Sequence, residues 1–249
     1  MNFFRRLHAK LRALSNANGY TCDGCGTELF NYPAERLCKA CEQALFPTPR
    51  LHCGKCGRQT VAEGLCLDCK QRMPVFTRGF APFVYIGETA GFINRMKNGN
   101  RRLALYFGER MAEYFLQELP QDPTPFLVVP VPMTEEKMKM RGYNQAEELA
   151  IALCAQLRKR GVEAELDGSV LQKRYDSAQQ KYLNKKQRRE NIAGVYHVHK
   201  RAACKGKTVL LIDDIHTTGA TGDECTTRLL RAGAEKVYFL TATTLSEEK

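Results

Sequence analysis

Segment 209–221, with the sequence VLLIDDIHTTGAT, constrains the fold of this 249-residue chain more strongly than any other part. The four apolar residues at its start predict a strand that is buried on both faces. Asp213 and Asp214 follow directly, and a threonine-rich loop then leads to residues 223–231, which predict a helix. The segment therefore predicts a strand, an acidic pair, a polar loop and a helix in immediate succession.

The polar loop has the composition of an anion-binding site. The first turn of a helix presents backbone N–H groups without partners inside the helix, and the helix dipole adds positive potential there. Threonine hydroxyls add donors, and glycine lets a phosphate approach the backbone without a Cβ in the way. The predicted phosphate-binding residues are Thr217, Thr218, Gly219, Ala220 and Thr221. We expect His216, which stands just before them, to face outward.

The acidic pair gives this site a second half. Carboxylates accept hydrogen bonds from vicinal hydroxyl groups such as those of a ribose. Asp213 and Asp214 stand only a few positions before the phosphate loop. A phosphate and a ribose diol held side by side describe a pentose 5-phosphate, so the segment predicts a binding site for such a sugar phosphate.

Eight of the eleven cysteines form four C-x-x-C pairs in the first third of the chain. Clustered cysteines without a secretory signal indicate metal binding rather than disulfides. Because four thiolates complete a closed tetrahedral zinc site, we expect two structural zinc ions in a double zinc ribbon over residues 21–72. Consecutive pairing closes shorter loops and is favoured, but interleaved pairing also stays open. The predicted ligands are Cys22, Cys25, Cys38, Cys41, Cys53, Cys56, Cys66 and Cys69.

The composition is that of a soluble globular protein, with 43% hydrophobic and 26% charged residues. The sequence has no apolar run of about 18 residues that would cross a membrane, and its first residues lack the apolar core of a secretory signal. We therefore expect a cytoplasmic protein. The formal net charge of +11 favours a polyanionic partner such as nucleic acid, anionic lipid or a phosphorylated substrate, although solubility also explains such an excess.

Residues 1–20 predict a short basic amphipathic helix, because apolar residues recur at helical spacing with arginine and lysine largely between them. Such a helix can attach to a membrane surface, or it can pack its apolar stripe on the protein's own core. We favour packing, since most amphipathic helices are packed ones.

Beyond the break at Met73 and Pro74, residues 73–249 predict a single α/β domain. Strands and helices alternate there, which favours a parallel sheet. The expected elements are strands at 79–86, at 126–131 and within 162–171, and helices at 90–97, 103–119 and 146–160. Because ligands bind beyond the carboxyl ends of parallel strands, the loops after Val131 and Ile212 are expected to share one crevice.

Two basic segments lie in the middle of the chain. The first contains Lys137 and the sequence RGYNQA at 141–146, and it forms a cationic loop that could meet a pyrophosphate. The second, residues 173–191, mixes lysine and arginine with tyrosine. Such a segment can bind single-stranded nucleic acid, close over a diphosphate as a mobile loop, or form a solvated helix face. The predicted nucleic-acid contacts are Lys181, Lys185, Lys186, Arg188 and Arg189.

The order of these features resembles the ComF family, which includes ComFC and GntX-like proteins. The resemblance rests on the tandem zinc ribbons, the VPVP strand end at 129–132, RGYNQAEELA at 141–150 and the Gln–Leu–Arg–Asn spacing at 180–191. It also rests on segment 209–221, which looks like the PRPP-binding motif of type I phosphoribosyltransferases; PRPP is 5-phosphoribosyl 1-diphosphate. The match runs over nearly the whole chain. The family usually has phenylalanine at the position of Tyr143.

The resemblance implies a type I phosphoribosyltransferase-like parallel sheet with a small N-terminal zinc-ribbon module in which four cysteines hold each ion. It implies that Asp213 and Asp214 hold the ribose hydroxyls of PRPP, that the threonine loop holds the 5-phosphate, and that Arg141 and Lys137 lie near the pyrophosphate. Magnesium would accompany PRPP and be bound mostly through diphosphate and ribose oxygens.

Two functions follow from the resemblance. ComF-like proteins are associated with DNA uptake in natural transformation, which implies a competence factor that binds PRPP and takes part in the uptake or processing of single-stranded DNA, together with other DNA-uptake proteins. The alternative is a metabolic phosphoribosyltransferase that transfers the phosphoribosyl group to a nucleobase or an amine. The sequence names neither an acceptor nor a general base, so turnover stays open.

Overall fold

The computed structural model describes residues 21–119, 125–174 and 194–246. These residues fall into two compact units, the first ending at Ala44 and the second beginning at Leu45. The first unit holds one cysteine group, the short helix α2 (Lys39–Gln43) and an isolated antiparallel bridge between Thr21 and Glu28. The second unit holds the sheet, its helices and the other cysteine group.

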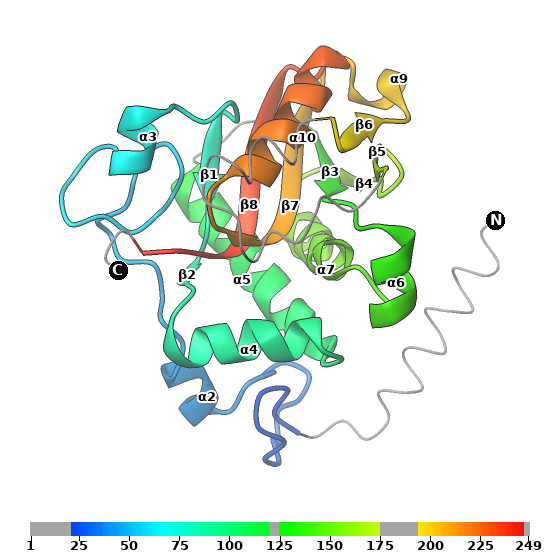
Figure 1. Ribbon diagram of the computed structural model, residues 1–249. Helices are drawn as coiled ribbons and strands as arrows, with labels where there is room; N and C mark the ends of the chain where they lie inside the picture. The colour runs from blue at the N-terminus through cyan, green and yellow to red at the C-terminus, as the bar shows by residue number, and fades with distance from the viewer. Residues whose placement is uncertain (1–20, 120–124, 175–193, 247–249) are drawn as a thin grey trace. The chain divides into compact units, whose positions relative to one another are not determined.

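A parallel sheet forms the centre of the second unit (Figure 1). Among the described residues, six strands join in the order β1–β8–β7–β3–β4, with β2 also paired to β8. All of these pairs are parallel. In chain order the strands are β1 (Arg78–Phe80), β2 (Phe83–Val84), β3 (Phe126–Pro130), β4 (Ala164–Leu166), β7 (Thr208–His216) and β8 (Lys236–Thr244). The predicted α/β class, with a parallel sheet and small four-cysteine groups near the N-terminus, is confirmed.

Helices cover both faces of this sheet. Helix α10 packs on one face, where its Leu229 groups with Leu211 of β7 and Phe239 of β8 in a buried apolar cluster. On the other face α5 and α7 pack closely, since a Cβ on Gly108 would lie 2.6 Å from the Cβ of Ala152. The helices of this unit are α3 (Leu67–Gln71), α4 (Gly87–Lys97), α5 (Arg102–Glu118), α6 (Glu135–Arg141), α7 (Gln145–Lys159), α9 (Arg201–Cys204) and α10 (Ala220–Arg231).

Several elements differ from the sequence prediction. The single strand expected at 79–86 is divided into β1 and β2, because Pro82 stands between them and has no N–H to donate. Strand β7 continues through the acidic pair to His216, where a loop was expected. Helix α6 was not predicted. Residues after β4 form a separate antiparallel ladder of β5 (Leu171–Lys173) and β6 (Tyr196–Val198).

The second cysteine group is part of the apolar core of its unit. Its four cysteines belong to the same buried cluster as Phe76 and Phe239, whose ring centroids are 5.4 Å apart. A Cβ on Gly57 would lie 2.7 Å from the carbonyl oxygen of Gly79, so the chain can pass here only with glycine. The sequence assigned this group to a separate domain over residues 21–72, a division that stays a prediction.

Three features of the sequence prediction lie outside the described residues: the basic helix at 1–20, most of the linker at 121–125, and the basic residues Lys181 to Arg189. In the part of the chain that the structure describes, none of the helices has both the length and the apolar character needed to cross a bilayer.

Candidate functional site

The acidic pair lies near the end of β7. Asp213 and Asp214 are half-buried, and the preceding Ile212 accepts a backbone hydrogen bond of 2.8 Å from Val131, so the ends of β3 and β7 lie side by side. The backbone N–H of Asp214 donates to Oδ1 of Asp213 at 2.9 Å. Burial, and then the neighbouring carboxylate of Asp214, raise the pKa of Asp213 to about 7.

The threonine loop joins β7 to α10 through Gly219. This glycine is the residue before the helix and has a φ of 74°, a left-handed conformation that glycine adopts without strain. Its carbonyl accepts from the N–H of Asp223 at 2.8 Å, and the N–H of Ala220 donates to the hydroxyl of Thr218 at 3.4 Å. The loop hydroxyls are half-buried. A helix start with accessible hydroxyls and first-turn N–H groups can accept a phosphate.

His216 was predicted to face outward, and this prediction is wrong. The side chain is buried, with 4% exposure, and its Nδ1 lies 3.2 Å from the carbonyl oxygen of Cys56. The ring meets Phe76 and Phe239 edge-on. Burial, helped by the charge of Arg58, lowers the pKa of His216 to about 4, so the ring is neutral at neutral pH. The segment of the second cysteine group covers His216. The sequence around His216 does not indicate this long-range contact.

Two hydrogen bonds link the second cysteine group to the loop and to α10. The guanidinium of Arg58 donates to Oδ2 of Asp68 at 2.7 Å and to the carbonyl oxygen of Thr217 at 2.5 Å. The backbone N–H of Val75 donates to Oδ1 of Asp223 in the first turn of α10 at 2.8 Å. Both sides of the threonine loop are therefore attached to the chain that carries this cysteine group.

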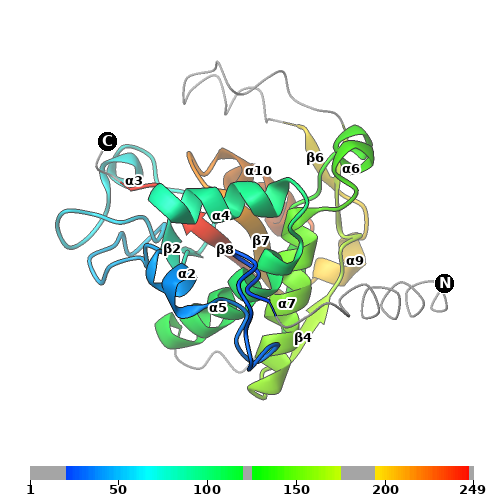
Figure 2. The same cartoon turned by 90° about the horizontal axis from the view of Figure 1, so that it is seen from below.

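Helix α4 brings a cation to the acidic pair. Figures 1 and 2 show α4 lying across the carboxyl end of the sheet. Its last residue, Lys97, places Nζ 3.1 Å from Oδ2 of Asp214. Sequence reasoning did not select Lys97, because nothing in the local sequence separates it from the other basic residues nearby.

The RGYNQ segment fastens the end of α4. The hydroxyl of Tyr143 donates to the carbonyl of Met96 and accepts from the N–H of Gly99 at 3.2 Å. The amide of Gln145 donates to the carbonyl of Lys97 at 3.4 Å. These contacts reach the turn that carries the lysine beside the acidic pair.

The same segment also reaches β3. The side-chain amide of Asn144 donates to the carbonyl of Val131 at 3.0 Å, and its oxygen caps α7 by accepting from Ala146 at 3.1 Å. Arg141 donates to Gln145 at 3.3 Å. Lys137, like Arg141, is half-buried on α6. Their predicted contact with a pyrophosphate stays a prediction.

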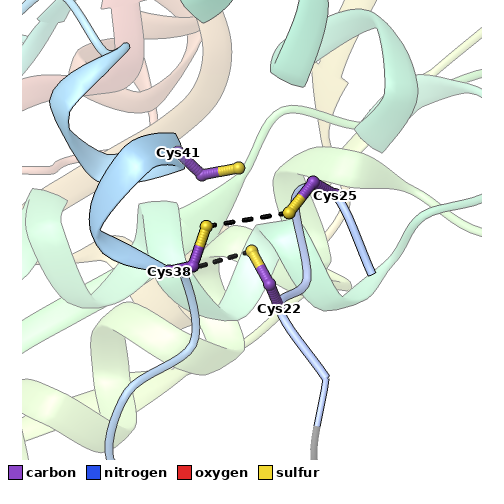
Figure 3. A group of neighbouring side chains, drawn as sticks. All are labelled: Cys22, Cys25, Cys38 and Cys41. Carbon is purple, nitrogen blue, oxygen red and sulfur yellow. Dashed lines mark hydrogen bonds between the residues drawn. The ribbon is translucent and has the colours of Figure 1, made fainter. Parts of the chain in front are cut away.

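The cysteines form two groups of four, each from consecutive C-x-x-C pairs. In each group the ligand atoms all lie within 4.8 Å of one another. A zinc ion bound at about 2.3 Å in tetrahedral geometry separates its sulfurs by about 3.8 Å. The sulfurs of Cys25 and Cys38 are 3.7 Å apart (Figure 3), and those of Cys56 and Cys66 are 3.6 Å apart. Both groups therefore fit zinc, in the sequential arrangement, and could hold one ion each.

Comparisons with known proteins give a consistent set of relatives, although no protein-family model matches the chain. Competence protein F of Haemophilus influenzae is 27% identical over 238 residues, covering 90% of this chain and 96% of that protein. Competence protein ComFC of Bacillus subtilis is 24% identical over 196 residues, covering 76% and 75%. DNA utilization protein YhgH of Escherichia coli K12 is 26% identical over 207 residues, covering 81% and 87%. These relatives, each similar to most of this chain, support the ComF family.

Solved structures similar to this chain are more distant. The glutamine PRPP amidotransferase of B. subtilis has a TM-score of 0.34 and 18% identity, covering 57% of this chain but only 27% of the enzyme. A hypoxanthine phosphoribosyltransferase of Staphylococcus aureus has a TM-score of 0.32 and 16% identity, covering 55% of this chain and 62% of the other.

Proposed function

We propose that this ComF-family protein binds PRPP with magnesium at the acidic pair and the threonine loop, and that it takes part in handling single-stranded DNA during natural transformation. One observation supports this ligand above all: two half-buried carboxylates near the end of β7 stand a few residues before a threonine loop whose Gly219 leads into α10. A ribose diol and a 5-phosphate need these two kinds of partner side by side.

The roles in the site follow from the chemistry of each group. Asp213 and Asp214 accept hydrogen bonds from the ribose hydroxyls, and the N–H groups and hydroxyls of the loop donate to the 5-phosphate. Arg141 and Lys137 on α6 serve as cations for the diphosphate. Magnesium, when bound, neutralises diphosphate charge while keeping several of its own waters.

Calorimetric titration of magnesium–PRPP tests the ligand. The wild type should bind, and the Asp213→Asn/Asp214→Asn double variant should lose about 100-fold or more in affinity, because each carboxylate contributes a charged hydrogen bond. Glu113→Gln on α5 is the control for an equal type of charge change, since Glu113 pairs with Arg110 and Arg160 instead. No binding by a zinc-loaded wild type would overturn the proposed ligand.

The DNA part of the proposal is supported by the names of the relatives, two of which are competence proteins and one a DNA utilization protein. The net charge of +11 agrees with a polyanionic partner.

Binding of single-stranded DNA should weaken as salt is added. For each phosphate that the protein neutralises, the slope of log K against log salt concentration should be steeper by about 0.7. Replacing Lys185, Lys186, Arg188 and Arg189 with glutamine should flatten this slope by up to about 3. A slope that the substitutions leave unchanged would exclude these residues as contacts.

The alternative function is turnover by a metabolic phosphoribosyltransferase, which the acidic pair and the threonine loop also favour. Pyrophosphate would leave the anomeric carbon through an oxocarbenium-like state, and the protein's residues would position the ribose and stabilise charge on the leaving group. Pyrophosphate release with one member of a panel of nucleobases and amines would establish this activity. If no member of the panel causes pyrophosphate release while PRPP still binds, the protein binds PRPP without turning it over.

A further inference from the structure

We propose that Lys97 is the cation that receives the diphosphate of the bound sugar, leaving Asp214 when the ligand enters, and that Tyr143 and Gln145 position it for this exchange. The inference rests on the proposed PRPP site and adds a residue that the resemblance to the family did not supply.

Lys97 already stands where the exchange has to take place. Its Nζ is 3.1 Å from Oδ2 of Asp214, and the two side chains keep 23% and 16% of their surface exposed. The ion pair is therefore at the mouth of the site and can be reached by a ligand. A ribose hydroxyl that donates to Asp214 takes up the carboxylate oxygens that the lysine now uses. A partly buried ammonium that loses its partner is unfavourable unless another anion replaces it.

The diphosphate is the anion that the ligand itself brings. An acidic pair and a polyanionic sugar repel each other, so the site needs cations close to both. The charge of Lys97, like that of Lys173, lowers the pKa of Asp213 against the stronger effects of burial and Asp214. The lysine therefore acts on both carboxylates of the pair. On ligand binding, the same charge can serve the diphosphate by a short movement of a flexible side chain.

Contacts from the RGYNQ segment hold the backbone at Lys97. The last four carbonyls of a helix have no partner inside the helix. At the end of α4, two of these carbonyls accept from the RGYNQ segment: Met96 from the Tyr143 hydroxyl and Lys97 from the Gln145 amide. Tyr143 is buried, and the guanidinium of Arg101 lies 4.4 Å from its ring centre. Tyr143 and Gln145 are thus positioning residues, acting through Lys97.

Two ligands separate a diphosphate contact from a structural role. Magnesium–PRPP carries the diphosphate, and ribose 5-phosphate lacks it while keeping the same diol and 5-phosphate. We expect Lys97→Met to weaken PRPP about tenfold or more, as the loss of a charged hydrogen bond does, and to leave ribose 5-phosphate affinity equal or higher. Lys97→Arg should restore much of the PRPP affinity, and Arg95→Met, an exposed residue of the same helix, should change neither.

The positioning role has its own variants. Tyr143→Phe should weaken PRPP by about threefold to tenfold with little effect on ribose 5-phosphate, because it removes the hydrogen bonds to Met96 and Gly99 at the end of α4. Gln145→Leu should have a similar effect, because it removes the bond to the carbonyl of Lys97 and also the one that Arg141 donates. Equal losses for both ligands in Lys97→Met would overturn the inference, since the lysine would then only support the acidic pair. An unchanged PRPP affinity would overturn it as well. A wild type that binds neither ligand would instead refute the proposed function, and the inference with it.

Discussion

The guanidinium of Arg58 donates a hydrogen bond of 2.5 Å to the carbonyl oxygen of Thr217, a residue 159 positions further along the chain. The same guanidinium holds Asp68, which lies in α3 between two cysteines of the second group. The Arg58 side chain is only 8% exposed. A single buried cation therefore connects the second cysteine group to the loop that is proposed to hold the 5-phosphate. A structural change in the cysteine group should therefore alter the loop.

Replacing Arg58 with methionine removes both hydrogen bonds but keeps an apolar stem of similar length. We expect the free energy of unfolding to fall by about 2–4 kcal/mol, because Asp68 loses its buried partner. The affinity for magnesium–PRPP should fall about tenfold as the loop loses its anchor. Urea unfolding and calorimetry measure the two effects. Arg58→Lys keeps the charge but not the fork of donors, so its stability and PRPP affinity should lie between those of the wild type and Arg58→Met. Full PRPP affinity in Arg58→Met would show that the loop holds its shape without this bond.

The two cysteine groups should differ in their effect on the ligand site. The second group shares the apolar core with β7 and β8, whereas the first lies in the other compact unit. Cys56→Ser should therefore lose one zinc ion, destabilise the sheet unit and abolish PRPP binding, because structural zinc supplies folding energy to the segment it holds. Cys38→Ser should also lose one zinc ion but keep PRPP binding within about threefold of the wild type.

Zinc release measured with a chromogenic chelator gives the metal content. Thermal unfolding gives the stability, and calorimetry gives the PRPP affinity. The two variants serve as controls for each other, since each removes one thiolate from a group of four. Equal loss of PRPP binding in both would mean that the groups support the site to the same degree.

The local chemistry of the site could be predicted from sequence, and its surroundings could not. The strand, the acidic pair, the loop and the helix follow from neighbouring residues, because burial pattern and helix-start chemistry are local properties. Consecutive pairing of the cysteines also follows from short loops. In contrast, the burial of His216 depends on Cys56, 160 positions away in sequence. The contact of Lys97 with Asp214 likewise depends on how α4 crosses the sheet.

Secondary structure shows the same division. Helices α5, α7 and α10 lie close to their predicted bounds, since their apolar stripes repeat over several turns. The strand expected at 79–86 is divided at Pro82, and its two short pieces each pair with β8. Helix α6 was missed because it is short and charged, and what marks it in the structure is its cap at Thr134.

Alanine at Gly219 tests the shape of the loop. A φ of 74° strains an alanine by about 1–3 kcal/mol, and the added Cβ would lie 3.0 Å from Nε2 of His216. We expect Gly219→Ala to lower the unfolding free energy by this amount and to weaken PRPP about tenfold or more. Gly206→Ala is the matched control, because its φ of 68° brings the same strain while the Cβ meets nothing within 4 Å. It should lose stability but keep its affinity for PRPP. Comparable losses of PRPP affinity in both variants would show that general strain explains the result.

Stability should depend on pH through Asp213. Burial and the charge of Asp214 raise its pKa from 3.8 to about 7, so the folded protein binds a proton here that the unfolded chain has released. The favourable contribution of this protonation is fully present below about pH 4 and is lost as the pH rises through 7. Asp213→Asn removes the carboxylate, so the variant should be more stable than the wild type, by about 2 kcal/mol at pH 5 and by up to about 4 kcal/mol at pH 8.

Urea unfolding of both proteins at about pH 5, 6.5 and 8 measures this difference across the window in which the carboxyl titrates. Glu113→Gln on α5 is the control for losing a carboxylate in an ion pair. The stabilisation should come at a cost in ligand affinity, because an asparagine presents one acceptor where the ribose diol is proposed to use a charged carboxylate. If the gain of Asp213→Asn were the same at all three pH values, Asp213 would already be ionised at the lowest of them in the folded protein, and the acidic pair would carry its full charge before any ligand arrives.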